Sequence, residues 1–146
     1  MDIILKDLDA MRAFAENIVS LATALKGEKA TLVALHGDLG AGKTTLTQFM
    51  ASALGVETDV QSPTFVIQKS YDLQSKDFKK LVHIDAYRIE RPEEFVALKI
   101  SDTLKDPETL VVVEWPKQGG EHFADPALEV FLEFVDENTR KARIKK

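Results

Sequence analysis

A glycine-rich stretch from Gly37 to Thr45 carries the clearest chemistry in the sequence. It reads Gly-Asp-Leu-Gly-Ala-Gly-Lys-Thr-Thr and satisfies the pattern G-x-x-x-x-G-K-[ST]. Glycines let the backbone wrap so that successive N–H groups point at phosphate oxygens, and the following helix adds its positive N-terminal end. Lys43 should reach the β- and γ-phosphates, and the Thr44 hydroxyl should bind Mg²⁺. The stretch predicts a nucleotide site formed by Asp38, Leu39, Gly40, Ala41, Gly42, Lys43, Thr44 and Thr45.

The surroundings of this stretch decide between a nucleotide site and a chance match. An apolar β-type run, Thr31–Leu35, precedes it, and a helical pattern over Thr44–Leu54 follows, with Gly55 just past its end. The alternative is a glycine-rich turn with an exposed lysine. The strand, loop and helix occur in the order that phosphate binding requires, so the sequence favours the nucleotide site.

Two carboxylates follow apolar runs that are typical of strands. Asp85 ends Leu81–Asp85, and Glu114 ends Leu110–Glu114. The carboxyl ends of parallel strands meet at one edge of a sheet, so Lys43, Asp85 and Glu114 should converge there as the catalytic residues. An acid can also simply end a strand. Spacing alone favours Asp85 as the magnesium acid.

Three further features are open to two interpretations each. Ser62–Phe65 is either a loop that reports on the γ-phosphate or an ordinary Ser-Pro turn. Trp115, the single tryptophan, either packs or forms a contact surface beside Glu114. His36 and His83 lie in apolar strands and are interpreted as hydrogen-bonded core residues, and no histidine spacing predicts a metal site.

The predicted elements must bring these side chains together. Uniformly apolar runs are typical of strands that are covered on both faces, which favours an α/β fold. We predict a P-loop NTPase-like, three-layer fold with a mostly parallel sheet and an antiparallel C-terminal edge. The predicted strands are Asp2–Leu5, Thr31–Leu35, Thr64–Tyr71, Leu81–Asp85, Leu110–Glu114, Leu128–Val135 and an edge strand Arg140–Lys146; the helices are Asp7–Lys26, Thr44–Leu54 and Pro92–Leu98.

Composition limits the remaining possibilities. A length of 146 residues predicts a single domain, 1–146. The chain has no cysteine, which excludes disulfides, Cys-ligated zinc and thiol catalysis. Its net charge of −5 argues weakly against a module that binds nucleic acid alone. Neither a signal peptide nor a membrane-length apolar run is visible, so a cytoplasmic protein is expected.

Four blocks of residues together resemble the TsaE (YjeE) family, the bacterial P-loop ATPases required to form threonylcarbamoyladenosine in tRNA. The blocks are Gly37–Thr45, Ser62–Phe65, His83–Arg88 and Glu114–Pro116, in this order and spacing. The first block is generic, whereas the four together are specific. The likeness runs from about Leu8 to the C-terminal strands. One departure is that residues 96–106 lack a glycine expected after the predicted helix.

The resemblance implies a function that spacing does not show. It implies ATP and Mg²⁺ as ligands, slow hydrolysis by the isolated protein, and work in a complex with TsaD and TsaB, with tRNA reached only through that complex. The ATPase activity would support turnover of the complex. Thr44 and Glu114 then resemble the magnesium ligands, Asp85 the second catalytic acid, and Trp115 an aromatic residue beside the site.

Other functions use the same loop. A small-molecule kinase needs an arginine-rich lid, whereas the five arginines of this chain are scattered: Arg12, Arg88, Arg91, Arg140 and Arg143. A GTPase would carry the guanine-reading motif Asn-Lys-x-Asp, which is absent. A nucleotide-sensing scaffold without catalysis is not excluded by the sequence.

Overall fold

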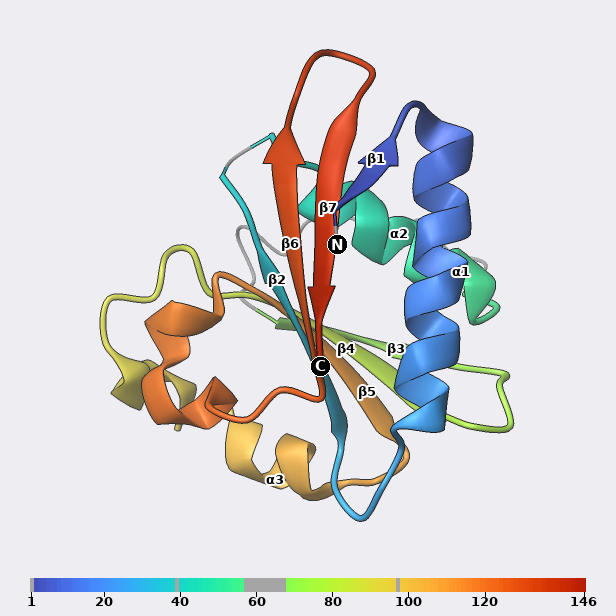
Figure 1. The fold of residues 1–146 in the computed structure, drawn as a ribbon. Helices are drawn as coiled ribbons and strands as arrows, with labels where there is room; N and C mark the ends of the chain where they lie inside the picture. The colour runs from blue at the N-terminus through green and yellow to red at the C-terminus, as the bar shows by residue number, and fades with distance from the viewer. Residues whose placement is uncertain (1, 39, 57–67, 97) are drawn as a thin grey trace.

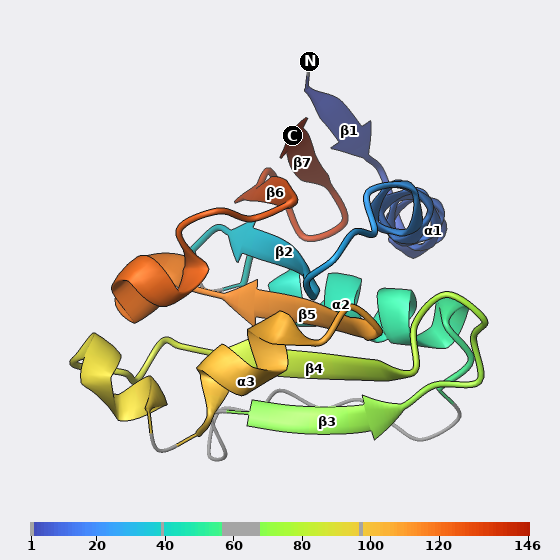
Figure 2. The same cartoon turned by 90° about the horizontal axis from the view of Figure 1, so that it is seen from below.

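Seven β-strands form one sheet in the computed structural model, which describes residues 2–38, 40–56, 68–96 and 98–146. Across the sheet the order is β1-β7-β6-β2-β5-β4-β3, which Figure 2 shows from top to bottom. The strands are β1 (Ile3–Leu5), β2 (Thr31–His36), β3 (Gln68–Asp72), β4 (Lys80–Asp85), β5 (Thr109–Glu114), β6 (Leu128–Phe134) and β7 (Arg140–Lys145).

The sheet is mixed rather than mostly parallel. Strands β6, β2, β5 and β4 run parallel to one another. Antiparallel strands flank them on both sides: β7 and β1 beyond β6, and β3 beyond β4. The predicted antiparallel C-terminal edge is confirmed by the β6–β7 pairing, whereas the prediction of a mostly parallel sheet was wrong, because the short β3–β4 connection adds a second antiparallel pair at the opposite edge. The tail pairs with β6 as predicted, but β1 forms the edge outside it.

Two helices cover one face of the sheet. Helix α1 (Leu8–Ala24) begins at the side chain of Asp7, which accepts the Ala10 N–H at 2.8 Å. Helix α2 (Lys43–Ala53) ends before Gly55, whose φ of 86° confirms the predicted glycine stop. Figure 1 shows both helices on the same side of the strands. Their buried side chains, including Phe14, Ile18, Leu46 and Met50, pack against Leu35, Leu110, Val112 and Val130 of the sheet.

Shorter elements cover the opposite face, giving three layers (Figure 1). They are two 3₁₀ segments, η1 (Pro92–Phe95) and η2 (Pro116–Phe123), and helix α3 (Ile100–Lys105). They enclose a second core with alternate residues of the same strands: Leu32, Ala34, Val111 and Val113 against Phe95, Ile100 and Phe123. Alternation along a strand sends successive side chains to opposite faces, so two helical layers are needed to cover both.

The predicted helix over Pro92–Leu98 was wrong in length. Only Pro92–Phe95 is helical, of the 3₁₀ type, and α3 begins at Ile100 after a turn. Lys99 in that turn has a φ of 55°, the left-handed conformation that favours glycine. A lysine thus adopts a left-handed conformation within the segment 96–106, which lacks the glycine that the family resemblance leads one to expect.

Two other expectations meet the limits of the described residues. The predicted strand Thr64–Tyr71 overlaps β3, which begins at Gln68, whereas Ser62–Phe65 and Leu39 lie outside the described residues. Within the described ranges, no helix has the length and apolar character that crossing a membrane would require.

Candidate functional site

The loop between β2 and α2 is shaped by its glycines. At Gly37, φ is 152°, and an added Cβ would lie 2.5 Å from the backbone oxygen of Leu132 on β6. Gly42, the residue before α2, has a φ of 102° and faces the side chain of Met11. A side chain at either position would be strained, so the sequence pattern has a direct structural reason. The loop thus follows the ends of β2 and β6 closely and turns into the N-terminus of α2.

Lys43 points back across this loop. Its Nζ donates hydrogen bonds to the carbonyl oxygens of Gly37 and Asp38, the latter at 3.1 Å. The same nitrogen lies 4.3 Å from the centre of the Trp115 ring. Only 5% of the residue is exposed, and this burial lowers the pKa of Lys43, which the negative charges of Glu114 and Asp85 oppose. The ammonium is thus held in a partly dehydrated position at the mouth of the loop.

Both predicted acids lie at the same edge of the sheet. The parallel register of β4 and β5 places Asp85 directly opposite Glu114, and both are buried. The hydroxyl of Thr44 is 3.3 Å from Oε1 and 3.2 Å from Oε2 of Glu114. Asp85 instead accepts the N–H of Tyr87 at 3.0 Å. Geometry therefore pairs Thr44 with Glu114, although spacing alone favoured Asp85.

The environment of Asp85 favours its protonated form. Burial raises the pKa of this carboxyl above its ordinary value of 3.8, and the nearby charge of Glu114 adds to the rise. The Tyr87 N–H and the charges of His83 and Lys43 act in the opposite direction. A carboxyl group with a raised pKa is a better proton acceptor than an ordinary aspartate.

Trp115 follows Glu114 in an unusual backbone conformation. Its φ is 58° and its ψ is 53°, the left-handed region, which costs an ordinary L-residue about 1–2 kcal/mol. The ring packs against Tyr87 with centroids 5.1 Å apart and covers Lys43. Of the two interpretations of Trp115, the structure shows that the residue both packs and lines the site.

These side chains surround a cavity of about 330 Å³. It brings together the predicted residues Lys43, Thr44, Asp85, Glu114 and Trp115. The predicted loop residues Gly40, Gly42 and Thr45 line it too, and Tyr87, Arg88 and Arg140 complete its walls. The predicted Asp38 accepts a hydrogen bond from Lys43 at its carbonyl oxygen, the predicted Ala41 is buried within the loop, and Leu39 lies outside the described residues.

Sequence reasoning missed two residues at this site. His83 was expected to be a core histidine and is completely buried, but its Nε2 lies 2.6 Å from Oε2 of Glu114. Its position two residues before Asp85 on a strand places both on the same face, a signal that was available. Arg140 belongs to β7, whose pairing with β6 brings it to the loop. His36, also expected in the core, is half-buried, stacks on Phe131 and contacts Glu129.

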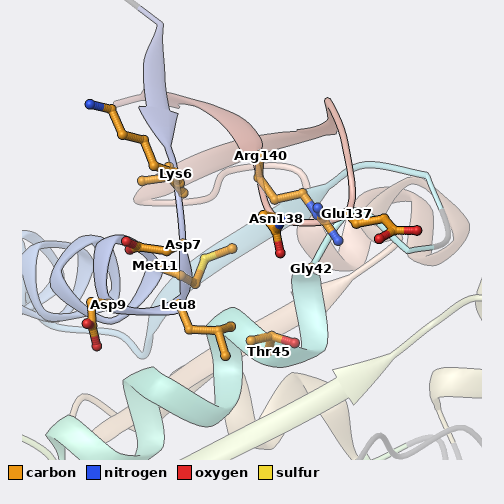
Figure 3. A pocket seen from close by; sticks show the side chains of 11 residues that line it. Lys6, Asp7, Leu8, Asp9, Met11, Gly42, Thr45, Glu137, Asn138 and Arg140 are labelled. Atoms are coloured by element: carbon orange, nitrogen blue, oxygen red, sulfur yellow. The ribbon is translucent and has the colours of Figure 1, made fainter.

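A second, larger cavity of about 680 Å³ adjoins the first, because Gly42, Thr45 and Arg140 line both. Figure 3 shows its walls: the beginning of α1 with Leu8 and Met11, the beginning of α2, and the β6–β7 turn. Its walls combine apolar side chains with polar groups from that turn, namely Glu137, Asn138 and Arg140. The volume is in the range of cavities that bind small molecules.

Comparison with known proteins identifies the family of the chain. The family described as "Threonylcarbamoyl adenosine biosynthesis protein TsaE" matches residues 5–143, nearly the whole chain. The chain belongs to the TsaE family. This confirms the resemblance carried by the four sequence blocks.

Relatives of the TsaE family extend over most of the chain. A tRNA threonylcarbamoyladenosine biosynthesis protein TsaE from Aquifex aeolicus is 36% identical over 98% of this chain and 94% of its own length. The TsaE of Haemophilus influenzae is 32% identical over 88% of this chain and 78% of its own. The crystal structure of Bacillus subtilis YdiB shares the fold, with a TM-score of 0.70 and 24% identity over 97% of this chain and 82% of that one.

Proposed function

We propose that this TsaE-family protein is a P-loop ATPase that binds ATP with Mg²⁺ between β2 and α2 and hydrolyses it slowly on its own. The observation that carries the proposal is the convergence of Lys43, Thr44, Asp85 and Glu114 on one cavity. A cation, a hydroxyl and two carboxylates beside a helix N-terminus are the groups that phosphoryl transfer uses. In such sites catalysis consists of positioning and charge stabilisation.

The phosphates are expected to bind at the loop. The N-terminus of the 11-residue helix α2 carries a partial positive charge and unpaired N–H groups. The ammonium of Lys43, held by the carbonyls of Gly37 and Asp38, lies directly beside it. Because charge-assisted bonds to phosphate are stronger than bonds to neutral carbonyls, the β- and γ-phosphates should take over these contacts.

The oxygen donors next to Lys43 fit Mg²⁺. Thr44 and Glu114 present a hydroxyl and a carboxylate at 3.2–3.3 Å from each other, and hard cations prefer oxygen ligands. In the described part of the chain, no group of three His, Cys, Asp or Glu residues could hold a metal. Mg²⁺ typically binds through one or two carboxylates together with substrate phosphates, and it supplies positive charge to them. We assign Thr44 and Glu114 to this role.

Asp85 is proposed as the second catalytic acid. Its carboxyl group is buried at the cavity, where its raised pKa suits it to accept a proton from an attacking water. Trp115 would shield Lys43 and this water from bulk solvent. A dry site strengthens the charges that stabilise the transition state.

The adjoining cavity of about 680 Å³ is proposed to hold the adenine and ribose. The cavity begins at Gly42 and Thr45, the part of the loop beside which the α-phosphate would lie. Leu8 and Met11 offer an apolar surface on which the adenine base could pack, and the side-chain amide of Asn138 could form hydrogen bonds with the edge of the base. Cavity and loop together would hold a whole nucleoside triphosphate.

Slow hydrolysis follows from what the cavity contains. Fast P-loop switches use an additional cation, often supplied by a partner, which is worth about 10³–10⁵ in rate. Two arginines, Arg88 and Arg140, line the cavity. Nη1 of Arg140 donates to the carbonyls of Asp136 and Thr139, which hold its guanidinium in the β6–β7 turn. We propose that TsaD and TsaB complete the site, and that tRNA meets this protein only through them. Hydrolysis would then support turnover in threonylcarbamoyladenosine formation.

Steady-state phosphate release tests the proposal. The protein is assayed alone, with TsaD and TsaB together, with each separately, and with tRNA, always with Mg²⁺. We expect slow release alone and a clear increase with both partners, by less than the roughly 10³–10⁵ of fast switches. A chain that turns over alone at about 1–100 s⁻¹, unchanged by the partners, would instead behave as a small-molecule kinase.

A further inference from the structure

His83 and Glu114 form a buried pair that the proposed catalytic roles leave unexplained. They lie on the adjacent parallel strands β4 and β5, with side-chain exposures of 0% and 5%. Nε2 of His83 is 2.6 Å from Oε2 of Glu114. A carboxylate oxygen accepts hydrogen bonds, so the Nε2–H group of His83 donates a hydrogen bond to Glu114.

We propose that His83 is a positioning residue, which fixes the carboxylate of Glu114 in the orientation that faces Thr44. This inference rests on the proposed function, in which Glu114 and Thr44 hold Mg²⁺. The hydroxyl of Thr44 divides its contact between both carboxylate oxygens at 3.2 and 3.3 Å, and so does not fix their rotation. The short bond from His83 acts on one oxygen only and does fix it.

The remaining surroundings of His83 support this role. Its ladder partners are Val112 on β5 and Lys69 on β3, and Val112 belongs to the core that α1 and α2 cover. The other ring nitrogen, Nδ1, is buried and has no hydrogen-bond partner among the described residues. A buried polar atom without a partner costs free energy. The hydrogen bond of Nε2 with Glu114 offsets this cost.

Carboxylates that bind metals are themselves commonly held by hydrogen bonds from surrounding groups. Replacing such a group typically costs about 10–100-fold in metal affinity or activity. Replacing His83 should weaken Mg²⁺ binding and leave the phosphate contacts of Lys43 unchanged, because His83 contacts Glu114 and does not line the cavity that holds Lys43. The two contributions can be separated by measuring ATP binding with and without Mg²⁺.

The variants His83→Gln and His83→Asn both carry a side-chain amide and differ mainly in how far that amide extends from the backbone. The side-chain nitrogen of His83→Gln can occupy the place of Nε2 and donate to Glu114, whereas His83→Asn ends near the place of Nδ1 and falls short. Titration calorimetry gives the ATP affinity of the full chain in Mg²⁺ and in EDTA, and urea unfolding checks the fold. We expect His83→Asn to lose about 10–100-fold in Mg²⁺-dependent affinity. Affinity in EDTA should stay unchanged, and His83→Gln should recover most of the loss.

Three results would overturn the role of His83: wild-type Mg²⁺ dependence in His83→Asn, equal losses in both amide variants, or losses of the same size in EDTA. If His83→Asn does not fold, His83→Leu, which fills the space with apolar volume, is compared with His83→Gln under the same criteria. A wild-type protein that binds no ATP in Mg²⁺ would overturn the proposed function as well. Normal ATP binding with an unaffected asparagine variant overturns the positioning role alone.

Discussion

Replacing Lys43 by methionine should abolish productive use of ATP and leave the fold almost unchanged. Methionine keeps the unbranched chain that packs beneath Trp115 and removes only the charge and its hydrogen bonds. The structure shows two opposing contributions to stability. The ammonium makes two hydrogen bonds and a ring contact, but it is also taken out of water, which lowers its pKa.

The stabilising contacts of the Lys43 ammonium and the cost of removing its charge from water nearly cancel. Two hydrogen bonds from a charged group contribute about 1.5–3 kcal/mol each, and a desolvated cation–π contact contributes about 2 kcal/mol. Burying the charge costs several kcal/mol in return. We therefore expect the free energy of unfolding to change by no more than about 1–2 kcal/mol. For the nucleotide, one unit charge about 4 Å from a phosphate contributes about 4 kcal/mol, or roughly 10³-fold in affinity.

Urea unfolding, ATP titration and phosphate release on Lys43→Met and the wild type measure all three quantities. The pH dependence gives a further check. Because the pKa of Lys43 is lowered below 10.5, folding favours the neutral amine, and the wild type should gain stability relative to Lys43→Met as pH rises from that lowered value toward 10.5. Normal hydrolysis by the variant, or an unfolded variant, would refute the reasoning.

Three further predictions concern the acids and the tryptophan. Glu114→Gln should weaken Mg²⁺-dependent ATP binding more than Asp85→Asn does, and Asp85→Asn should bind ATP but hydrolyse it poorly. Calorimetry with and without Mg²⁺ measures the two affinities, and the reverse ranking would exchange the roles assigned to Glu114 and Asp85. Because the pKa of Asp85 is raised above 3.8, its contribution to stability is present below that value and is lost as pH rises through the raised pKa. Urea unfolding should therefore show the wild type losing stability relative to Asp85→Asn over that window, and parallel pH profiles would contradict it. ATP with Mg²⁺ should change the fluorescence of Trp115, 4.3 Å from Lys43, and Lys43→Met should suppress the change; an unchanged signal while binding is shown by calorimetry would separate Trp115 from the nucleotide.

The sequence by itself determined the features that depend on local geometry. The stretch from Gly37 to Thr44 predicts a loop because its glycines occupy positive φ angles, and the structure has them there. The glycine stop of α2 at Gly55 could be predicted for the same reason, and the two strands that end in acids could be predicted from their apolar runs. Periodicity and turn chemistry act over a few residues, so they can be read without knowledge of the fold.

Spacing and periodicity did not decide which acid lies beside Thr44; the family resemblance pointed to Glu114, and the tertiary structure gives the physical reason. Spacing favoured Asp85, but β5 inserts between β2 and β4, so Glu114 is nearer although it comes later in the chain. The contact between His83 and Glu114 depends on the β4–β5 register, and the position of Arg140 depends on β7 returning beside β6. Strand order is set by how the layers bury their apolar faces across the whole chain. No local pattern encodes those long-range pairings, which is why these neighbours emerged only from the fold.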